Sequence, residues 1–423
     1  MAGAEGAGLV WRHVDVAGRI AAVALLALAL FCGAGAAWAA GKKSSGKKSG
    51  EASCVDKDDP PTFVWQKFKS GDTCVEFTNT LTAVYQRLLR SSGRLAEPSR
   101  RNTVSASNPE SKTLTYETSL KTTTPTGLGD LATSFGIKLE RSAGDTYVYT
   151  TLNEGTVSLA GVTAGYADSA MNFWSGDFQF NAAAASRTVG VARYEYEVIP
   201  DGKIGLSLET GVPTSQTNSR LFAPVYPKDP VVALRWLYET DPLSVQLAAM
   251  THRAKVEPER QIPGVAGRPD HFSGWAATAG ATVALPMIHE DDEISGQATY
   301  AANASSYLGT KSDLSTLANT LPFSVETRGW SAVASYHRQW SDQWESNVFV
   351  SRLELDITTP LGDPRLRSTR YAGNLIFKPR DDIKIGGELG LLDVWIENRG
   401  LLGVVRGASG RGLTGYLFVA ADF

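Results

Sequence analysis

The chain ends in the stretch Gly412-Leu-Thr-Gly-Tyr-Leu-Phe-Val-Ala-Ala-Asp-Phe423, and the fold can be worked out from there. One register of alternate residues holds Leu417 and Val419, and the other register holds the polar Thr414. This alternation predicts a β-strand whose two faces meet different surroundings. Chain ends are usually polar and frayed, so the terminal aromatic residue indicates an end that lies at a membrane interface and closes a sheet. The last strand of a soluble β-sandwich is the alternative that these residues leave open.

Composition excludes two classes of protein. The 423 residues carry 41 basic and 44 acidic side chains, a net charge of −3, so the chain has no positive field for a nucleic acid. No stretch beyond the N-terminal region reaches the roughly 18 consecutive apolar residues of a helical membrane span. The mean hydropathy of −0.14 fits a soluble protein and a membrane β-barrel equally, because one face of every barrel strand lines a polar lumen.

The N-terminus predicts export. Arg12 and Arg19 precede the apolar run 20–31, and the small-x-small triplet Ala37-Trp38-Ala39 follows it. A positive flank, a short apolar core and such a triplet are typical of a secretory signal peptide. We therefore assign residues 1–39 to a signal peptide that is cleaved after Ala39.

Residues 40–73 form a lead to the main part of the chain. The basic, Gly/Ser-rich segment 41–50 is too polar to pack, which predicts a flexible stretch. Once the signal peptide is removed, Cys54 and Cys74 are the two remaining cysteines. An exported protein reaches an oxidising compartment, which favours a disulfide between them. This bond would close a loop of about 20 residues and contribute roughly 3 kcal/mol, and two free thiols are the alternative.

Residues 74–423 alternate between apolar and polar side chains and contain no convincing helical stretch. The alternating runs predict an all-β fold, a transmembrane antiparallel β-barrel of about 16 strands. Short links such as Pro200-Asp201 alternate with longer polar segments, so we expect short periplasmic turns and long outer loops, a rhythm that a soluble sandwich does not need. The runs are 74–91, 112–121, 131–141, 146–153, 156–164, 187–198, 202–210, 230–239, 243–252, 274–285, 293–303, 328–340, 344–355, 369–379, 383–396 and 412–423. The longer segments lie near 92–111, 165–186, 211–229, 253–273, 304–327, 356–368 and 397–411, and the link near 142–145 is short where this scheme needs a long one.

Charged residues occupy only one register of several predicted strands. Lys384 and Glu388 alternate with Ile385 and Leu389. Unpaired charges in a packed sandwich core would cost several kcal/mol each, whereas a water-filled pore solvates them. In a barrel, the last strand would turn Leu413, Leu417, Val419 and Phe423 to lipid, and Thr414, Tyr416, Phe418 and Asp422 to the lumen.

Several segments resemble the alphaproteobacterial porin family. Cys54 together with Thr73-Cys-Val-Glu-Phe77 resembles the cysteine-bracketed start of the family's first strand, and 157–174 is similar to its strand that runs into a loop folded inside the barrel. Further similar segments are 285–287, 297–301, 339–344 and 374–383, whereas the lead at 41–50 and the stretch 92–135 depart from the pattern. The resemblance implies a homotrimeric general porin of the outer membrane, through which small hydrophilic solutes and ions diffuse. It also implies that Phe423 belongs to a C-terminal signal for the outer-membrane assembly machinery.

The loop between the strands that end near Val162 and begin near Arg187 is the candidate for a pore constriction. Its acidic residues are Asp168 and Asp177. Acids on the loop and bases on the facing wall would create a transverse field that orders ions and water, and neutralising Asp177 would then reduce cation preference. An exposed loop with ordinary turn residues is the alternative. The candidate wall bases are Arg193, Arg235 and Lys384.

The sequence predicts neither an enzyme nor a metal site. His289-Glu-Asp-Asp-Glu293 has residue types that bind metals, but it falls on a predicted turn, where a solvated acidic segment is the simpler explanation. None of the histidines lies near a serine or cysteine in a nucleophile motif. We therefore expect no catalysis and no cofactor. A substrate-selective channel, an outer-membrane barrel enzyme and a secreted soluble β-protein stay open as alternatives to the general porin.

Overall fold

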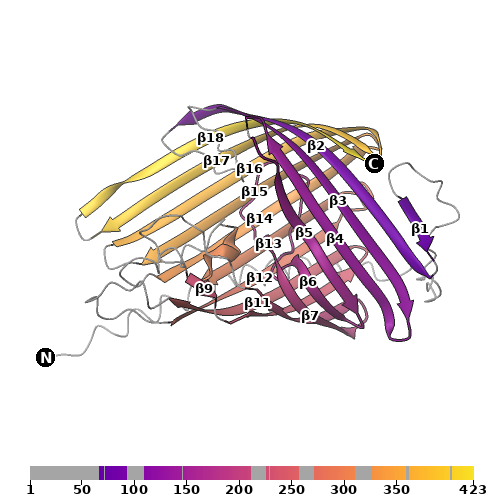
Figure 1. The fold of residues 1–423 in the computed structure, drawn as a ribbon. Helices are drawn as coiled ribbons and strands as arrows, with labels where there is room; N and C mark the ends of the chain where they lie inside the picture. The colour runs from indigo at the N-terminus through magenta and orange to yellow at the C-terminus, as the bar shows by residue number, and fades with distance from the viewer. Residues whose placement is uncertain are drawn as a thin grey trace. The chain divides into compact units, whose positions relative to one another are not determined.

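The structure is a computed structural model that describes residues 66–70, 72–92, 109–144, 146–210, 225–227, 229–256, 271–309, 326–358, 362–400 and 403–423 (Figure 1). The chain divides into two units, Met1–Ser53 and Cys54–Phe423, and every described residue belongs to the second unit. The predicted signal peptide, the basic lead and Cys54 lie outside the described residues. In the described ranges, no helix is both long and apolar enough to cross a membrane.

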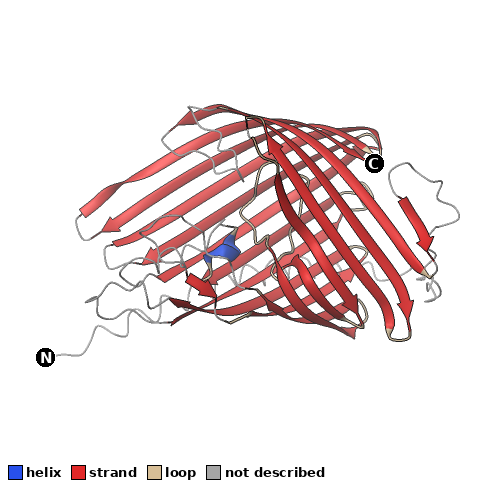
Figure 2. Ribbon diagram, in the orientation of Figure 1, coloured by secondary structure: helices blue, strands red, loops and turns tan. Residues whose placement is uncertain are grey.

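Sixteen long strands close into one antiparallel barrel, which confirms the predicted fold class (Figures 1 and 2). Consecutive strands pair with each other, β8 pairs with β10, and β18 pairs with β2 to close the ring. Two short strands, β1 (Gln66–Ser70) and β9 (Val225–Pro227), add to the edges of β2 and β11. The barrel strands are β2 (Thr73–Ser92), β3 (Glu110–Thr126), β4 (Gly129–Ser142), β5 (Tyr149–Leu159), β6 (Val162–Asp168), β7 (Thr188–Ile199), β8 (Gly202–Glu209), β10 (Val231–Thr240), β11 (Leu243–Val256), β12 (His271–Ala284), β13 (Glu293–Ala302), β14 (Glu326–Ser341), β15 (Trp344–Thr358), β16 (Gly362–Arg380), β17 (Ile383–Gly400) and β18 (Gly403–Asp422).

The hairpin between β5 and β6 corrects one predicted boundary. Its turn lies at Ala160 and Gly161, with φ of 51° and 80°, and not near 154–155 between the predicted runs. Two consecutive residues with positive φ give a tight hairpin turn whose twist matches that of the strands. Gly155 continues the strand instead and pairs with Tyr166. The link from β4 to β5 spans 143–148. It is therefore longer than the predicted link near 142–145, which was too short for the alternation of short turns and long loops.

Two predicted long loops are wrong. The segments 356–368 and 397–411 belong mostly to strands, because β15 reaches Thr358, β16 starts at Gly362, β17 reaches Gly400 and β18 starts at Gly403. Their charged side chains pair across neighbouring strands, as Arg365 does with Asp356. These strands therefore continue through polar residues, because the backbone hydrogen bonds between neighbouring strands extend beyond the apolar part of each strand.

Alternate residues separate an apolar outer face from a mixed inner face. In β18, Leu417 is 63% exposed, whereas its neighbours Tyr416 and Phe418 are 6% and 3% exposed, as the alternation predicts. The outer face carries large apolar side chains on most strands, among them Leu206, Leu234, Val348 and Leu389. The buried inner positions include many polar residues, such as Gln246, Thr278, Gln297, Asn347 and Glu388.

The seam between β18 and β2 joins the two ends of the barrel. The Phe423 amide donates to the carbonyl oxygen of Asn79 over 2.9 Å, and the Asn79 side-chain amide donates to the Phe423 carbonyl over 3.0 Å. Below this point β1 occupies the same edge of β2, with Ser70 opposite Thr73. Cys74 lies at the start of β2, and Cys54, its predicted disulfide partner, lies outside the described residues.

Candidate functional site

The connection between β6 and β7, residues 169–187, lies inside the barrel and is called the inner loop below (Figure 2). Its stem is closed by Asn172, which accepts a hydrogen bond from the Arg187 amide over 2.9 Å and donates one to the Arg187 carbonyl over 2.9 Å. From this stem the loop runs along the inner wall, where side chains of β8, β11 and β13–β17 bind it. An inward-folded loop of this kind narrows the lumen.

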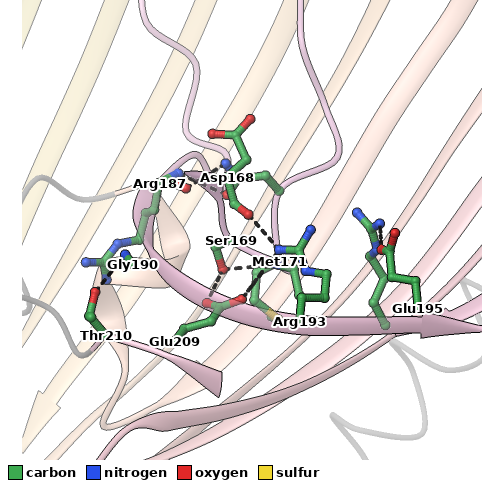
Figure 3. Close-up of polar contacts among 12 residues, drawn as sticks. Asp168, Ser169, Met171, Arg187, Gly190, Arg193, Glu195, Glu209 and Thr210 are labelled. Carbon is green, nitrogen blue, oxygen red and sulfur yellow. Dashed lines mark hydrogen bonds and ion pairs between the residues drawn. The ribbon is translucent and has the colours of Figure 1, made fainter. Parts of the chain in front are cut away.

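Glu209 of β8 holds the beginning of the inner loop (Figure 3). Its carboxylate accepts hydrogen bonds from the Ser169 hydroxyl and the Ala170 amide, each over 2.7 Å. Arg193 of β7 lies beside it, with a guanidinium nitrogen 3.9 Å from Glu209 and 2.7 Å from the Asp168 carbonyl oxygen that accepts its hydrogen bond. Since Glu209 is 1% exposed, this carboxylate needs these donors to offset its loss of water.

Two glutamines hold the next part of the loop. Gln246 of β11 donates to the carbonyls of Ala170 and Asn172 over 3.2 and 3.0 Å. Gln297 of β13 donates to the Met171 carbonyl over 2.8 Å and accepts from the Trp174 amide over 3.0 Å. Both glutamines are buried, so they replace the strand partners that the loop backbone lacks.

The part of the loop around residue 177 binds the opposite strands. Asn374 of β16 donates to the Asp177 carbonyl over 2.6 Å, and the Lys384 ammonium of β17 lies 2.7 Å from the Asp177 carboxylate. Glu388 of β17 accepts the amides of Gln179 and Phe180 over 2.9 and 2.6 Å. The loop therefore crosses from β8 to β17, and a buried wall glutamate binds it at each end of this crossing, Glu209 near residue 170 and Glu388 near residue 180.

Aromatic rings of the inner loop rest on glycines of the wall. A Cβ atom at Gly390 would meet the Phe180 ring at 2.5 Å, and one at Gly280 would meet the Phe173 ring at 2.2 Å. Phe178 packs edge-on against Phe349 of β15, with ring centroids 4.7 Å apart. These glycines let the loop lie directly on the backbone of the wall, which fixes how far it reaches into the lumen.

A second segment folds inward next to the inner loop. The short 3₁₀ helix η2 (Ser305–Leu308) follows β13, and its residues are buried. Arg187 donates to the Ser306 hydroxyl over 2.9 Å, and its guanidinium lies 5.0 Å from the centre of the Tyr307 ring. This segment supports the C-terminal stem of the inner loop.

The five residues selected from the sequence fall into two groups. Asp177 and Lys384 form one ion pair. Arg193 on β7 and Arg235 on β10 face the lumen from the two sides of β8, near the start of the loop, and Arg235 pairs with Glu195 of β7. The Asp168 carboxylate accepts a long hydrogen bond from Thr188, of 3.4 Å, and the Asp168 carbonyl oxygen accepts one from Arg193.

The sequence analysis missed the residues that hold the loop backbone. Among these are Glu209, Gln246, Gln297, Asn374 and Glu388. Their common signal is a polar side chain in the inward register of an otherwise apolar strand. That signal places them in the lumen, but their partners are backbone groups of a distant loop.

A closed β-barrel whose lumen is narrowed by an inward loop defines the class of diffusion channels. Residues 72–385 match the model of the family described as the Porin subfamily. This match covers most of the chain, and the protein belongs to this porin family, as a channel of the outer membrane for passive diffusion.

Similar solved structures have low sequence identity to this chain. The outer membrane channel DcaP of Acinetobacter baumannii is 15% identical with a TM-score of 0.63, over 84% of this chain and 99% of that chain. An anion-selective porin from Comamonas acidovorans is 12% identical with a TM-score of 0.49, over 83% of this chain and 100% of that chain. No curated protein matches the sequence.

Proposed function

We propose that the inner loop is the constriction of a general, weakly selective pore for small hydrophilic solutes and ions. The observation that carries this proposal is the anchoring of the loop by wall side chains from Glu209 on β8 to Glu388 on β17. A loop held at so many points keeps a fixed opening, and the rate of diffusion then depends on the width and charge of that opening.

The charges beside the loop support weak selectivity. Asp177 pairs with Lys384, and Arg235 pairs with Glu195. Paired charges cancel much of each other's field at a distance. We therefore assign Asp168, Asp177, Arg193, Arg235 and Lys384 to the opening, with a smaller transverse field than separate rows of acids and bases would give.

Conductance across a planar bilayer tests the proposal. The purified protein should give open channels whose current rises linearly with voltage and salt. Hydrophilic solutes of increasing size should enter liposomes at rates that fall smoothly with size and do not saturate. Saturation or competition between related solutes would instead support a substrate-selective channel, and absence of conductance would contradict an open pore and leave the barrel enzyme as the alternative.

Further features of the mature protein are part of the same proposal. We infer a cleaved signal peptide at residues 1–39, a disulfide between Cys54 and Cys74, no enzymatic activity, and membership of the alphaproteobacterial branch of the porins. Mass spectrometry of the purified protein, with and without reduction, should give an N-terminus at Ala40 and a mass difference of two hydrogens.

We also propose a homotrimer. One side of the barrel has short strands, since β6 and β8 have 7 and 8 residues, whereas β16 and β18 have 19 and 20. The outer face of this low side is apolar, and Val162 and Leu206 are 50% and 52% exposed. This side of the barrel, with its short strands and apolar outer face, is suited to contact with other copies of the chain. Such contact would cover the ends of the short strands, which do not extend as far across the membrane as the others. Light scattering with correction for detergent should give three chains per particle.

A further inference from the structure

A groove crosses the outer face of the barrel from β17 to β4. Its volume is about 740 Å³. It follows one row of hydrogen-bonded neighbours, because Ile385 pairs with Val419, Val419 with Ala83, Ala83 with Leu114, and Leu114 with Arg141. Three of these side chains face outward with 45–49% exposure, namely Ile385, Val419 and Leu114.

The small side chain of Ala83 forms the low point of the groove. The larger side chains of Leu417 and Tyr85, which are paired with each other, line the groove on one side of Ala83. Five strands give four spacings of about 4.8 Å, so the groove is roughly 19 Å long. Strands of such barrels tilt by about 35–45° from the membrane normal. A row of residues perpendicular to the strands therefore rises through the membrane. The height that this row spans is comparable to one leaflet of the roughly 30 Å hydrocarbon core.

Two cations stand at one end of this apolar groove. Lys112 near the start of β3 and Arg141 near the end of β4 are both exposed and line the groove. Both lie near the outer-loop ends of their strands, since β3 begins at Glu110 and β4 ends at Ser142. In the described ranges neither of them forms an ion pair, although most arginines of the barrel do. Unpaired cations on the lipid face are costly unless an anion meets them at the membrane boundary.

We propose that the groove binds one acyl chain of an anionic lipid of the outer leaflet, and that Lys112 and Arg141 bind its phosphate. The apolar floor suits the chain, and the paired cations suit the headgroup at the level where headgroups lie. This inference rests on the outer-membrane location of the porin, but it does not depend on the inner loop.

A second copy of the chain fits these cations less well. The outward-facing acids of the long strands already have partners on the same barrel, since Asp356 pairs with Arg365 and Asp393 with Arg411. Glu354 likewise pairs with Arg352 and Arg367. None of these three acids is free to bind Lys112 or Arg141 of a neighbour, whereas a lipid phosphate brings its own charge.

Native mass spectrometry of the full-length protein in detergent tests the proposal, with diphosphoryl lipid A as the probe. The wild type should bind one lipid tightly. Ala83→Phe should remove this binding by filling the groove, and the double variant Lys112→Gln/Arg141→Gln should weaken it about tenfold. Fully dephosphorylated lipid A should bind the wild type about as weakly as diphosphoryl lipid A binds the double variant.

Matched variants separate this site from general lipid binding. Ala249→Phe adds the same ring to an outward alanine of β11, which lies between Leu234 and Ala277, and it should bind lipid as the wild type does. Lys112→Arg/Arg141→Lys keeps both charges and should also bind. Equal binding by wild type and Ala83→Phe would overturn the proposal, and so would equal binding of the phosphorylated and dephosphorylated lipids. Loss of trimers in Ala83→Phe without loss of lipid would show that the groove holds another chain.

Conductance measured on the same samples keeps the two proposals apart. All groove variants should conduct as the wild type does, because their side chains point away from the lumen. A groove that fails the lipid test in a protein that conducts normally would refute the lipid site alone. Heat-modifiable migration in gels shows that each variant is folded before it is tested.

Discussion

The contact between Asp177 and Lys384 sets how the constriction treats ions at the scale of single residues. Asp177→Asn should leave an unpaired ammonium at the loop and shift the reversal potential in a salt gradient towards anion preference. Lys384→Gln should shift it towards cations, and the double variant should return close to the wild type. Both side chains are more than a third exposed, so stability should change by less than about 1 kcal/mol. Unchanged reversal potentials in both single variants would remove this pair from the opening.

Glu388 should matter for the width of the pore and not for its charge preference. It accepts two amides of the inner loop and is 3% exposed. Glu388→Ala would leave both donors unsatisfied, at a cost of about 1–3 kcal/mol each, so the loop should detach locally. We expect larger and noisier single-channel currents, whereas Glu388→Gln keeps one acceptor oxygen and should change them less. Quiet channels of wild-type size in Glu388→Ala would show that the other contacts are sufficient.

The sequence predicts the position of such residues but not their task. Alternation places Lys384 and Glu388 on the inner face, because a period of two fixes which side chains share a face. It does not reveal that Glu388 binds the Phe180 amide, because the two residues are 208 positions apart. Asp177 and Lys384 could be selected from the sequence, because an acid on the predicted loop and a base on the predicted wall indicate a charged pore constriction.

At the scale of elements, the seat of the inner loop on β17 depends on Gly390. Gly390→Ala would place a Cβ atom 2.5 Å from the Phe180 ring, which forces the loop or the strand to move at a cost of about 1–3 kcal/mol. Gly387→Ala on the same strand is the control, because its nearest neighbour would be Leu417 at an ordinary 3.7 Å. Single-channel conductance should change in Gly390→Ala and stay constant in Gly387→Ala. Equal behaviour of the two variants would contradict the tight seat.

The turn between β12 and β13 is tied to β14 through Asp292. Burial raises the pKa of this carboxyl, but hydrogen bonds from Arg338, the Gln339 amide and Tyr336 lower it more, so the pKa lies below its ordinary value. A depressed folded-state pKa stabilises the barrel above the unfolded pKa of about 4, and this contribution is lost as the pH falls through the folded value. Asp292→Asn should therefore lower the unfolding temperature at pH 7, and the difference from the wild type should shrink below about pH 4. A difference independent of pH would contradict this.

Strand existence was easier to predict than strand length. Sixteen runs could be found because each alternates over several residues, but the ends of β15–β18 could not. Charged residues such as Arg365 and Arg411 are read as loop signals in a sequence. In the folded chain they pair with a partner on the next strand and lengthen the sheet. The turn at Ala160 was missed for a related reason, since Gly155 is the stronger turn signal nearby.

At the scale of the whole molecule, the barrel combines two different packing problems. The outer face needs only apolar side chains, and its pattern is visible in the sequence. The inner face must satisfy the backbone of an irregular loop, and it does so with single polar residues from at least six strands: Glu209, Gln246, Gln297, Ser351, Asn374 and Glu388. No local sequence pattern connects these positions, because they all bind the inner loop but do not recur at a regular spacing in the sequence.

Phe423 adds contacts at the end of the seam that closes the barrel. Phe423 binds Asn79 through two backbone-directed hydrogen bonds, and its ring centroid lies 6.3 Å from that of Tyr116 on β3. Deletion of Phe423 removes all three contacts together with the proposed assembly signal, so we expect less folded protein in the outer membrane while export to the periplasm continues. Heat-modifiable protein in membrane fractions, compared with total periplasmic protein, measures this.

Variants at the partners of Phe423 separate closure from signalling. Asn79→Ala removes the hydrogen bond to the Phe423 carbonyl and the one accepted from the Tyr116 hydroxyl, and it leaves the C-terminal residue in place. If Phe423 acts only as a signal, Asn79→Ala should assemble normally. If it also closes the seam, Asn79→Ala should assemble at a normal rate and unfold at a lower temperature, because two hydrogen bonds of roughly 1 kcal/mol each are lost. Normal assembly of the protein without Phe423 would refute both roles, because neither the signal nor the seam would then depend on this residue.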